Sequence, residues 1–283
     1  MPWTRERSAV RTLGPEDLQV ALACVDRSPV VNVFVDYRIR STRMERRLLG
    51  GEIWGHYRGA RLTSMCHVGS NLVLVNADDE AARAFAKSTL ERRPHLATMV
   101  GERAAIEAFW DVVQHDWWQP HDFRWDQPHL ELADDPLAVA DPAVQRTRLD
   151  QLDVLYPACV AMYSEEVGSS PEADGGRSLY RQRVAGLIER GWSFSRIEND
   201  QVLFKAEVAC ASPHAAQIQG VYVAPEYRGQ GLATAGMAAV VREIQTSIAP
   251  TASLYLNAHN GAARTAYERV GFRQTATFST LMF

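Results

Sequence analysis

A glycine-rich turn in the second half of the chain constrains the fold more than any other feature. The segment Gln219–Thr234 reads Gln-Gly-Val-Tyr-Val-Ala-Pro-Glu-Tyr-Arg-Gly-Gln-Gly-Leu-Ala-Thr. A β-rich run ends at Val223, Pro225 turns the chain, and two glycines open a helix that extends to Ile248. Glycines let successive backbone N–H groups point toward one place, and a helix N-terminus adds partial positive charge. The turn therefore predicts a phosphate or pyrophosphate site, with a plain strand-to-helix connection as the alternative.

Two better-known phosphate-binding loops are excluded here. No Gly-Lys-Ser/Thr follows the turn, as a P-loop requires, and the spacing G-x-G-x-x-G of the dinucleotide-binding fingerprint is absent. Around the turn, hydrophobic periodicity and turn residues predict the order α-α-β-β-β-α-β-α-β, which builds a mixed sheet with helices on its faces, an α/β class. The expected helices are 149–166, 178–190, 231–248 and 261–270, and the expected strands are 192–198, 202–210, 216–223, 253–256 and 275–283.

Two motifs in this half resemble one protein family. Arg228-Gly-Gln-Gly-Leu-Ala233 is similar to the Arg/Gln-x-x-Gly-x-Gly/Ala signature of the GCN5-related N-acetyltransferases, the GNAT family. About 30 residues later, Asn260-Gly-Ala-Ala-Arg-Thr-Ala-Tyr267-Glu-Arg-Val-Gly-Phe272 resembles the family's Asn-x-x-Ala-x-x-x-Tyr…Gly-Phe block. The resemblance covers roughly residues 148–283. It implies a GNAT fold and acetyl-CoA as co-substrate, with no metal.

The resemblance also implies where acetyl-CoA lies. The cofactor is expected in a V-shaped gap between the strand before the glycine turn and the next strand, with the pantetheine arm along the edges of Val221 and Val223. A bulge at Gly220 would free an N–H, that of Tyr222, to polarise the thioester carbonyl. Asn260 is expected to contact the pantetheine. The full set of expected cofactor-binding residues is Val221, Tyr222, Val223, Arg228, Gly229, Gln230, Gly231, Leu232, Ala233, Thr234, Asn260, Ala263 and Tyr267.

Tyr267 and Glu207 are the expected catalytic residues. In the family the matching tyrosine protonates the departing thiolate, and an ordinary tyrosine pKa near 10 suits that donation; a plain core tyrosine is the alternative. The strand 216–223 contains no carboxylate, so Glu207 on the preceding strand is the candidate general base. His214, Glu165 or a chain of waters are alternatives to Glu207.

The first half has a similar order of elements but no glycine turn. Its expected elements are a helix 15–25, a β-rich run 30–37, strands 53–57, 61–68 and 71–75, a helix 78–90, a strand 96–100, a helix 102–114 and an aromatic stretch 115–129. Asp78, Asp79 and Glu80 begin its helix after the third strand and would repel a pyrophosphate. The chain therefore resembles tandem acetyltransferases, with a degenerate GNAT-like domain at 1–133, a linker at 134–147 and a catalytic domain at 148–283.

Composition limits the other possibilities. The net charge is -4, so neither nucleic acid nor an anionic membrane is an expected partner. No long apolar run and no signal-peptide pattern is present, so a cytoplasmic protein is expected. Cys24, Cys66, Cys159 and Cys210 are widely spaced and are predicted to be buried thiols. The arginines in 38–47 are expected on solvated faces, with local pairing to Glu45 and Glu52. An acidic partner, a nucleic acid or the CoA 3′-phosphate is the alternative for this cluster.

The expected activity is direct transfer of an acetyl group from acetyl-CoA to a primary amine in a ternary complex. A longer acyl-CoA and a non-catalytic CoA sensor or scaffold are the alternatives. The acceptor, a small molecule or a peptide or protein amine, stays open, as does monomer or homodimer. The loop Gly168–Gly176 is expected to act as a mobile substrate lid or to be a passive connection. All tryptophans except Trp192 lie in the first half, where they are expected in a core or interface.

Overall fold

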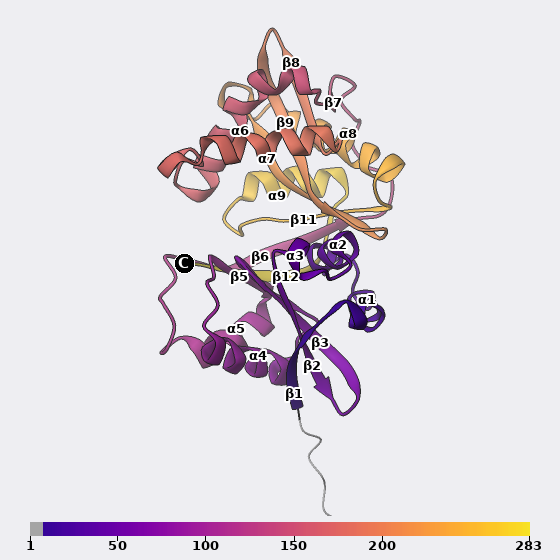
Figure 1. The fold of residues 1–283 in the computed structure, drawn as a ribbon. Helices are drawn as coiled ribbons and strands as arrows, with labels where there is room; N and C mark the ends of the chain where they lie inside the picture. Colours follow the sequence, from indigo (N-terminus) through magenta and orange to yellow (C-terminus); the bar gives the residue numbers. More distant parts are fainter. Residues whose placement is uncertain (1–7) are drawn as a thin grey trace, which may run out of the picture. The chain divides into compact units, whose positions relative to one another are not determined.

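A computed structural model describes residues 8–283 and divides the chain into two compact units (Figure 1). The first unit holds the chain up to His129 together with residues 255–259 and 274–283, and the second holds residues 130–254 and 260–273. Trp3 lies outside the described residues. Each unit is a mixed sheet flanked by helices, which confirms the predicted fold class. No helix in the described part of the chain is long and apolar enough to cross a membrane.

The first unit is built on a mixed sheet whose strand order is β1-β2-β3-β4-β5-β12-β6. Strand β4 pairs with β5 in parallel, and β1, β2, β3 and β4 pair in antiparallel succession. Strand β1 is absent from the sequence-based expectation, and the other strands lie close to it. The strands are β1 (Ser8–Leu13), β2 (Gly51–Arg58), β3 (Arg61–Gly69), β4 (Asn71–Val75), β5 (Thr98–Glu102), β6 (Asp122–Leu132) and β12 (Arg273–Met282).

Helices cover both faces of this sheet because neighbouring strand residues point to opposite sides. Trp54 and Leu74 join the core beneath α4 (Asp79–Arg92) and α5 (Arg103–Val113). Ile53 and Val75, one position away on the same strands, join the core beneath α1 (Leu18–Val25) and α2 (Val33–Thr42). A short helix α3 (Arg46–Leu49) leads into β2, and a 3-10 turn η1 (Pro15–Asp17) precedes α1. Of the described tryptophans here, Trp54, Trp110 and Trp117 are buried and Trp118 is exposed.

The expected β-rich run at 30–37 is wrong, because α2 occupies Val33–Thr42. Val35, Ile39 and Thr42 are buried at helical spacing, and this amphipathic pattern outweighs the local β propensity of the valines. Asp36 is also buried and accepts a hydrogen bond from Arg40 Nε at 2.6 Å, one turn later. Among the arginines of 38–47, Arg46 pairs with Glu52 as expected.

The last strand of the chain completes the first unit. Residues 278–282 of β12 pair antiparallel with β5, from Phe278 opposite Glu102 to Met282 opposite Thr98. Ser279 Oγ donates to the backbone oxygen of Trp125, and Thr280 Oγ1 donates to Gln127 Oε1, both at 2.6 Å. Residues 274–283 thus belong to the first compact unit. The domain boundaries 1–133, 134–147 and 148–283 remain a prediction from sequence.

The second unit carries the strand order β11-β10-β9-β8-β7. Helices α6 and α7 share a buried cluster that includes Cys159, and α8 packs on the other face, where Gly236 lies against the ring of Phe204. The four cysteines are buried free thiols, as predicted. The strands are β7 (Gln145–Arg146), β8 (Ser193–Glu198), β9 (Gln201–Ala211), β10 (Ala215–Val223) and β11 (Thr251–Tyr255), and the helices are α6 (Leu152–Val167), α7 (Arg177–Glu189), α8 (Leu232–Ser247) and α9 (Gly261–Val270), with 3-10 turns η2 (Leu149–Gln151), η3 (Ala173–Gly175) and η4 (Pro225–Tyr227).

Candidate active site

Strand β10 parts from its parallel neighbour halfway along its length. Only Ala215, Ala216 and Gln217 pair with β11, at Thr251, Ala252 and Ser253. The rest of β10, up to Val223, leaves its β11-facing edge without that partner, although the opposite edge stays paired with β9. An unpaired strand edge offers backbone N–H and C=O groups that an extended ligand can bind as an added strand. This is the opening expected beside Val221 and Val223.

A bulge interrupts β10 at the predicted position. Gln219 lies opposite Glu207 and Tyr222 opposite Lys205, so Gly220 and Val221 together face the single residue Ala206. Gly220 has φ of +59°, a left-handed conformation that glycine adopts at low cost. A side chain there would also meet Glu207 Oε2 and Lys205 Nζ, each 3.2 Å from the position of a Cβ. The backbone angle therefore favours glycine, and a larger residue would also press on these side chains.

The glycine turn after β10 adopts the conformation its sequence predicts. Gly229 and Gly231 have φ of +74° and +84°, and a Cβ at either position would meet nothing within 4 Å. Glycine is therefore required here for its backbone angles. Gly231 is the N-cap of α8 and supplies no side chain to the N–H groups of the first turn. These donors at a positive helix end form a place for an anion.

The Arg228 side chain folds back from the turn onto β10 and α6. Its Nε donates to the Val223 oxygen at 3.0 Å, and its Nη2 pairs with Glu165 at 2.8 Å. Its guanidinium also lies 5.7 Å from the ring of Tyr222. Helix α6 is therefore tied to the turn, and its Met162 lies next to Gly220. The expected cofactor residues from Val221 to Thr234 thus follow one another along the end of β10, the turn and the start of α8.

Helix α9 carries the other two predicted residues. Tyr267 is buried on α9, which packs against α8. Burial raises the pKa of Tyr267 above its usual value, and the nearby carboxylate of Glu166 adds to the effect. Tyr267 is therefore protonated at neutral pH and can act only as a donor. Asn260 caps α9, because its Oδ1 accepts the Ala263 N–H at 3.1 Å.

Glu207 is buried in an ion pair that the sequence analysis did not anticipate. Lys205 Nζ donates to Glu207 Oε1 at 2.6 Å, and both side chains are almost fully inaccessible. Gln219 Nε2 donates to Glu207 Oε2 at 3.3 Å, and Cys159 Sγ donates to Oε1 at 3.7 Å. Burial alone would lower the pKa of Lys205, but the attraction of Glu207 outweighs it and the pKa is raised. Burial also raises the pKa of the Cys159 thiol to about 12, so the thiol keeps its proton.

The alternative bases lie in less suitable places. His214 precedes β10, at the end of the strand opposite to the glycine turn. Glu165 is exposed and paired with Arg228. Lys205 is the residue missed from sequence, although a lysine between Phe204 and Ala206 in a buried apolar strand is a usable signal.

The equivalent turn of the first unit has different chemistry. After β4, Asp78 caps α4 by accepting the Ala81 N–H at 3.1 Å, and Arg58 lies against Asp78 at 2.9 Å and Glu80 at 2.6 Å. Carboxylates and a guanidinium thus stand at the helix start where the second unit has glycines. The degenerate first domain stays a prediction from the sequence.

Comparisons with known proteins agree with this geometry. The family model described as "Acetyltransferase (GNAT) family" matches residues 182–272, and one described as "Domain of unknown function (DUF4081)" matches residues 51–155. No curated protein sequence matches the chain.

Solved structures share the fold over nearly the whole length. An acetyltransferase from the GNAT family of Colwellia psychrerythraea is 17% identical with a TM-score of 0.59, covering 97% of this chain and 99% of that one. A Drosophila protein is 15% identical with a TM-score of 0.66, covering 98% and 99%. A tandem GNAT protein from the clavulanic acid biosynthesis pathway is 13% identical with a TM-score of 0.59, covering 98% of each chain. The second half of the chain therefore contains a domain that matches the GNAT acetyltransferase family, at residues 182–272.

Proposed function

We propose that this protein transfers an acetyl group from acetyl-CoA to a primary amine, directly and within a ternary complex. The observation that carries the proposal is the unpaired edge of β10 leading into the turn at Gly229 and Gly231. The edge suits the amide-containing pantetheine arm, and the helix start suits the pyrophosphate. One continuous piece of backbone thus offers complementary groups to both parts of the cofactor.

In this proposal, the bulge at Gly220 marks the position on β10 where the thioester reacts. A thioester bound along the strand edge would bring its carbonyl to the N–H groups around Tyr222, which stabilise the negative charge that develops on the oxygen. The amine nitrogen attacks the carbonyl carbon, the C–S bond breaks, and the thiolate takes a proton from Tyr267. Burial raises the pKa of Tyr267, and burial would also raise that of a thiol leaving into the same surroundings, so the transfer stays feasible.

Glu207 is the proposed general base for the attacking amine. It lies directly beside the bulge, with Oε2 3.2 Å from where a Gly220 Cβ would be. Its buried position and its partners Lys205 and Gln219 keep the carboxylate fixed. A water at the bulge would carry the proton from the amine to Glu207, since this residue is only 4% exposed.

The same buried ion pair favours a second candidate, a CoA-binding protein without turnover. The Glu207 carboxylate is already engaged by Lys205 at 2.6 Å and by Gln219 at 3.3 Å, which leaves it little room to contact an amine or a water. In that case CoA would bind but no amine would be acetylated. A longer acyl donor is a variation of the main proposal and is distinguished by comparing donors of increasing length.

Two measurements test the proposal. Calorimetric titration with acetyl-CoA should show binding, and no binding at high micromolar concentrations would refute both candidates. A mass-spectrometric screen of amine acceptors with acetyl-, propionyl- and longer acyl-CoA should then identify a product; binding without any product favours the second candidate.

A variant pair tests the acid. Tyr267→Phe should lower kcat by about 10²-fold or more, the usual contribution of a positioned proton donor, while acetyl-CoA binding is kept. Tyr156→Phe is the matched control, since the Tyr156 hydroxyl is bonded to Glu172 and the Arg177 backbone. Equal turnover in the two variants would show that Tyr267 is a structural tyrosine.

A further inference from the structure

A pocket lies in the first unit, and none of its lining residues belongs to the proposed active site. Its volume is about 600 Å³, within the range of small-molecule pockets. It opens between α1 and the hairpin that joins β2 to β3. Its lining combines apolar side chains with three arginines: Val20, Ala23, Cys24, Arg27, Arg58, Ala60, Arg61 and Leu62.

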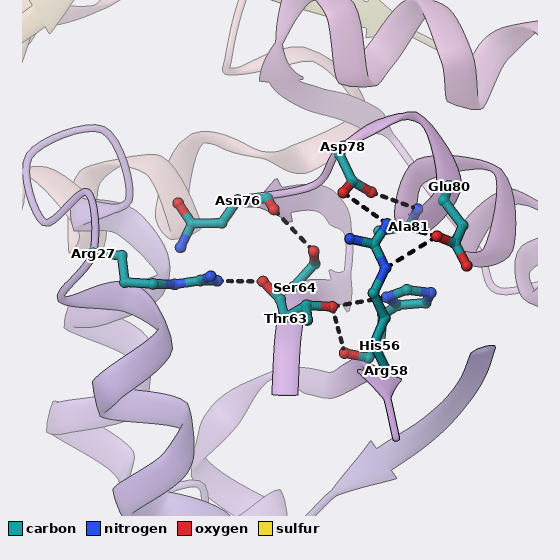
Figure 2. Close-up of polar contacts among 9 residues, drawn as sticks. All are labelled: Arg27, His56, Arg58, Thr63, Ser64, Asn76, Asp78, Glu80 and Ala81. Atoms are coloured by element: carbon teal, nitrogen blue, oxygen red, sulfur yellow. Dashed lines mark hydrogen bonds and ion pairs between the residues drawn. The ribbon is translucent and has the colours of Figure 1, made fainter. Parts of the chain in front are cut away.

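Two of these arginines are held rigidly by the protein. Arg27, just after α1, donates from Nε to the Cys24 oxygen at 3.4 Å and from Nη2 to the Thr63 oxygen. Arg58 donates from Nε and Nη2 to Glu80 at 3.0 and 2.6 Å, and from Nη2 to Asp78 at 2.9 Å. Figure 2 shows Arg27 reaching toward Thr63, and Arg58 lying against the two carboxylates. Ligand binding would therefore cost little conformational entropy at these two side chains.

Both of these guanidinium groups retain N–H donors that could bind a ligand. Their anchoring bonds use Nε and Nη2, so within the described chain the Nη1 groups of Arg27 and Arg58 make no hydrogen bond. Arg61 is exposed, and no described side chain pairs with it. Asp78 and Glu80 hold Arg58 but do not line the pocket. The lining therefore contains no carboxylate, and its positive charge comes from Arg27 and Arg61, since the charge of Arg58 is compensated by Asp78 and Glu80.

Polar groups behind the pocket keep the wall in place. Ser64 Oγ donates to the Asn76 oxygen at 2.8 Å (Figure 2). Asn76 Nδ2 donates to the Cys24 oxygen at 2.6 Å, which links β3, the end of β4 and α1. Thr63 Oγ1 donates to the His56 oxygen at 3.1 Å across the hairpin. Burial lowers the pKa of His56, so this histidine is neutral at physiological pH and the arginines carry the charge.

We propose that this pocket binds a small amphiphilic anion, a carboxylate on an aliphatic chain or an aromatic ring. The guanidinium donors suit a carboxylate, which accepts bonds from several of them at once. Val20, Ala23 and Leu62 form an apolar surface that a fully polar anion such as phosphate would leave unused. Charge and apolar surface therefore select the same kind of ligand. The site would serve regulation or substrate recognition in the unit that lacks the glycine turn.

Calorimetric titration of the full chain with octanoate tests the proposal. Octanamide, with the same chain but no charge, and acetate, with the charge but no chain, are the comparison ligands. Octanoate should bind at least tenfold more tightly than either, a difference of about 1.4 kcal/mol, and its binding should weaken with added salt. Equal affinity for octanoate and octanamide, or no octanoate binding, would overturn the proposal.

Three variants locate the binding. Arg61→Ala should weaken octanoate binding about fivefold to tenfold. Arg47→Ala, at another exposed arginine of this unit that pairs with no described side chain, should leave it unchanged. Ala23→Phe, at an exposed position of the lining, should fill the pocket and abolish binding. If Ala23→Phe does not fold, Arg61→Glu takes its place, with the same expected loss. Parent-like octanoate binding in Arg61→Ala and in the blocking variant would place the ligand elsewhere.

Acetyl-CoA provides the control for location. Its binding to the second unit should be the same in Arg61→Ala and in the parent chain, and octanoate should not compete with it. Competition between the two ligands would assign octanoate to the acetyl-CoA site and would contradict the proposal.

Discussion

The buried pair Lys205–Glu207 allows a sharp test of structure against catalysis. Glu207→Gln would leave the Lys205 ammonium in an inaccessible site without its carboxylate. Breaking a buried pair in this way costs about 3–5 kcal/mol, a large share of the 5–15 kcal/mol that folded proteins typically have. The midpoint of urea unfolding, followed by circular dichroism, should therefore fall markedly.

A double variant separates the loss of charge from the loss of the pair. In Lys205→Met/Glu207→Gln the buried cation is gone, and the introduced amide oxygen can still accept the Gln219 N–H. Most of the stability should therefore return, so that the two substitutions are strongly non-additive. Unfolding of Glu207→Gln at the parent's urea concentration would refute the reasoning, because the ammonium could not then be buried and dependent on this carboxylate.

The double variant also decides the role of Glu207 in turnover. If Glu207 is the base, the stable double variant should lose about 10²-fold or more in kcat, as expected for general base catalysis, and should keep acetyl-CoA binding. Parent-like turnover would show that the ion pair is structural and that the amine loses its proton to another group or to water.

Three other predictions follow from the geometry. Gly231→Ala places an L-residue at φ of +84°, which costs about 1–2 kcal/mol, so calorimetry should show acetyl-CoA binding roughly tenfold weaker. The control Gly261→Ala should bind acetyl-CoA normally, because Gly261 has no positive φ and a Cβ there would meet nothing within 4 Å. A chain without residues 274–283 loses the β12 partner of β5, while β4 stays on the other edge. Hydrogen exchange should show loss of protection for the β5 amides that face β12; unchanged protection would contradict this pairing. Burial lowers the pKa of His129 from 6.5 to about 4; the unfolded chain therefore binds the proton first as the pH falls from 6.5 to 4, and stability should drop by up to about 3 kcal/mol over this window. His129→Phe should flatten that part of the pH dependence, and an unchanged slope would refute the assignment.

Most helices and strands could be predicted because their periodicity and their end signals agree. Strand β4 and helix α9 begin and end at the expected residues. The run 30–37 failed because its valines favour a strand locally, while the pattern that decides for a helix extends to Ile39 and Thr42. A longer window would have shown this helical spacing.

The partners of a strand are harder to predict than the strand itself. Residues 275–283 were expected to be a strand, but their pairing with β5 joins segments separated by most of the chain. Nothing local in an alternating apolar pattern specifies which sheet it completes. The predicted domain boundary was therefore placed at the linker 134–147 on the basis of its composition. The two observed units instead assign residues 274–283 to the first unit, because these residues pair with β5.

The two turns after β4 and β10 show which parts of a site can be inferred from sequence alone. Phosphate binding at a helix start depends on backbone donors and on glycine, so Gly229 and Gly231 predict a phosphate site without knowledge of any neighbour. The acids after β4 equally predict that a pyrophosphate is repelled. That Arg58 neutralises them depends on the hairpin that brings β2 back past α4, and this follows only from tertiary structure. The same hairpin places Arg58 and Arg61 on one pocket wall. The acidic turn after β4 therefore has two consequences. It repels a pyrophosphate, and it holds Arg58, whose remaining donors face the pocket of the first unit.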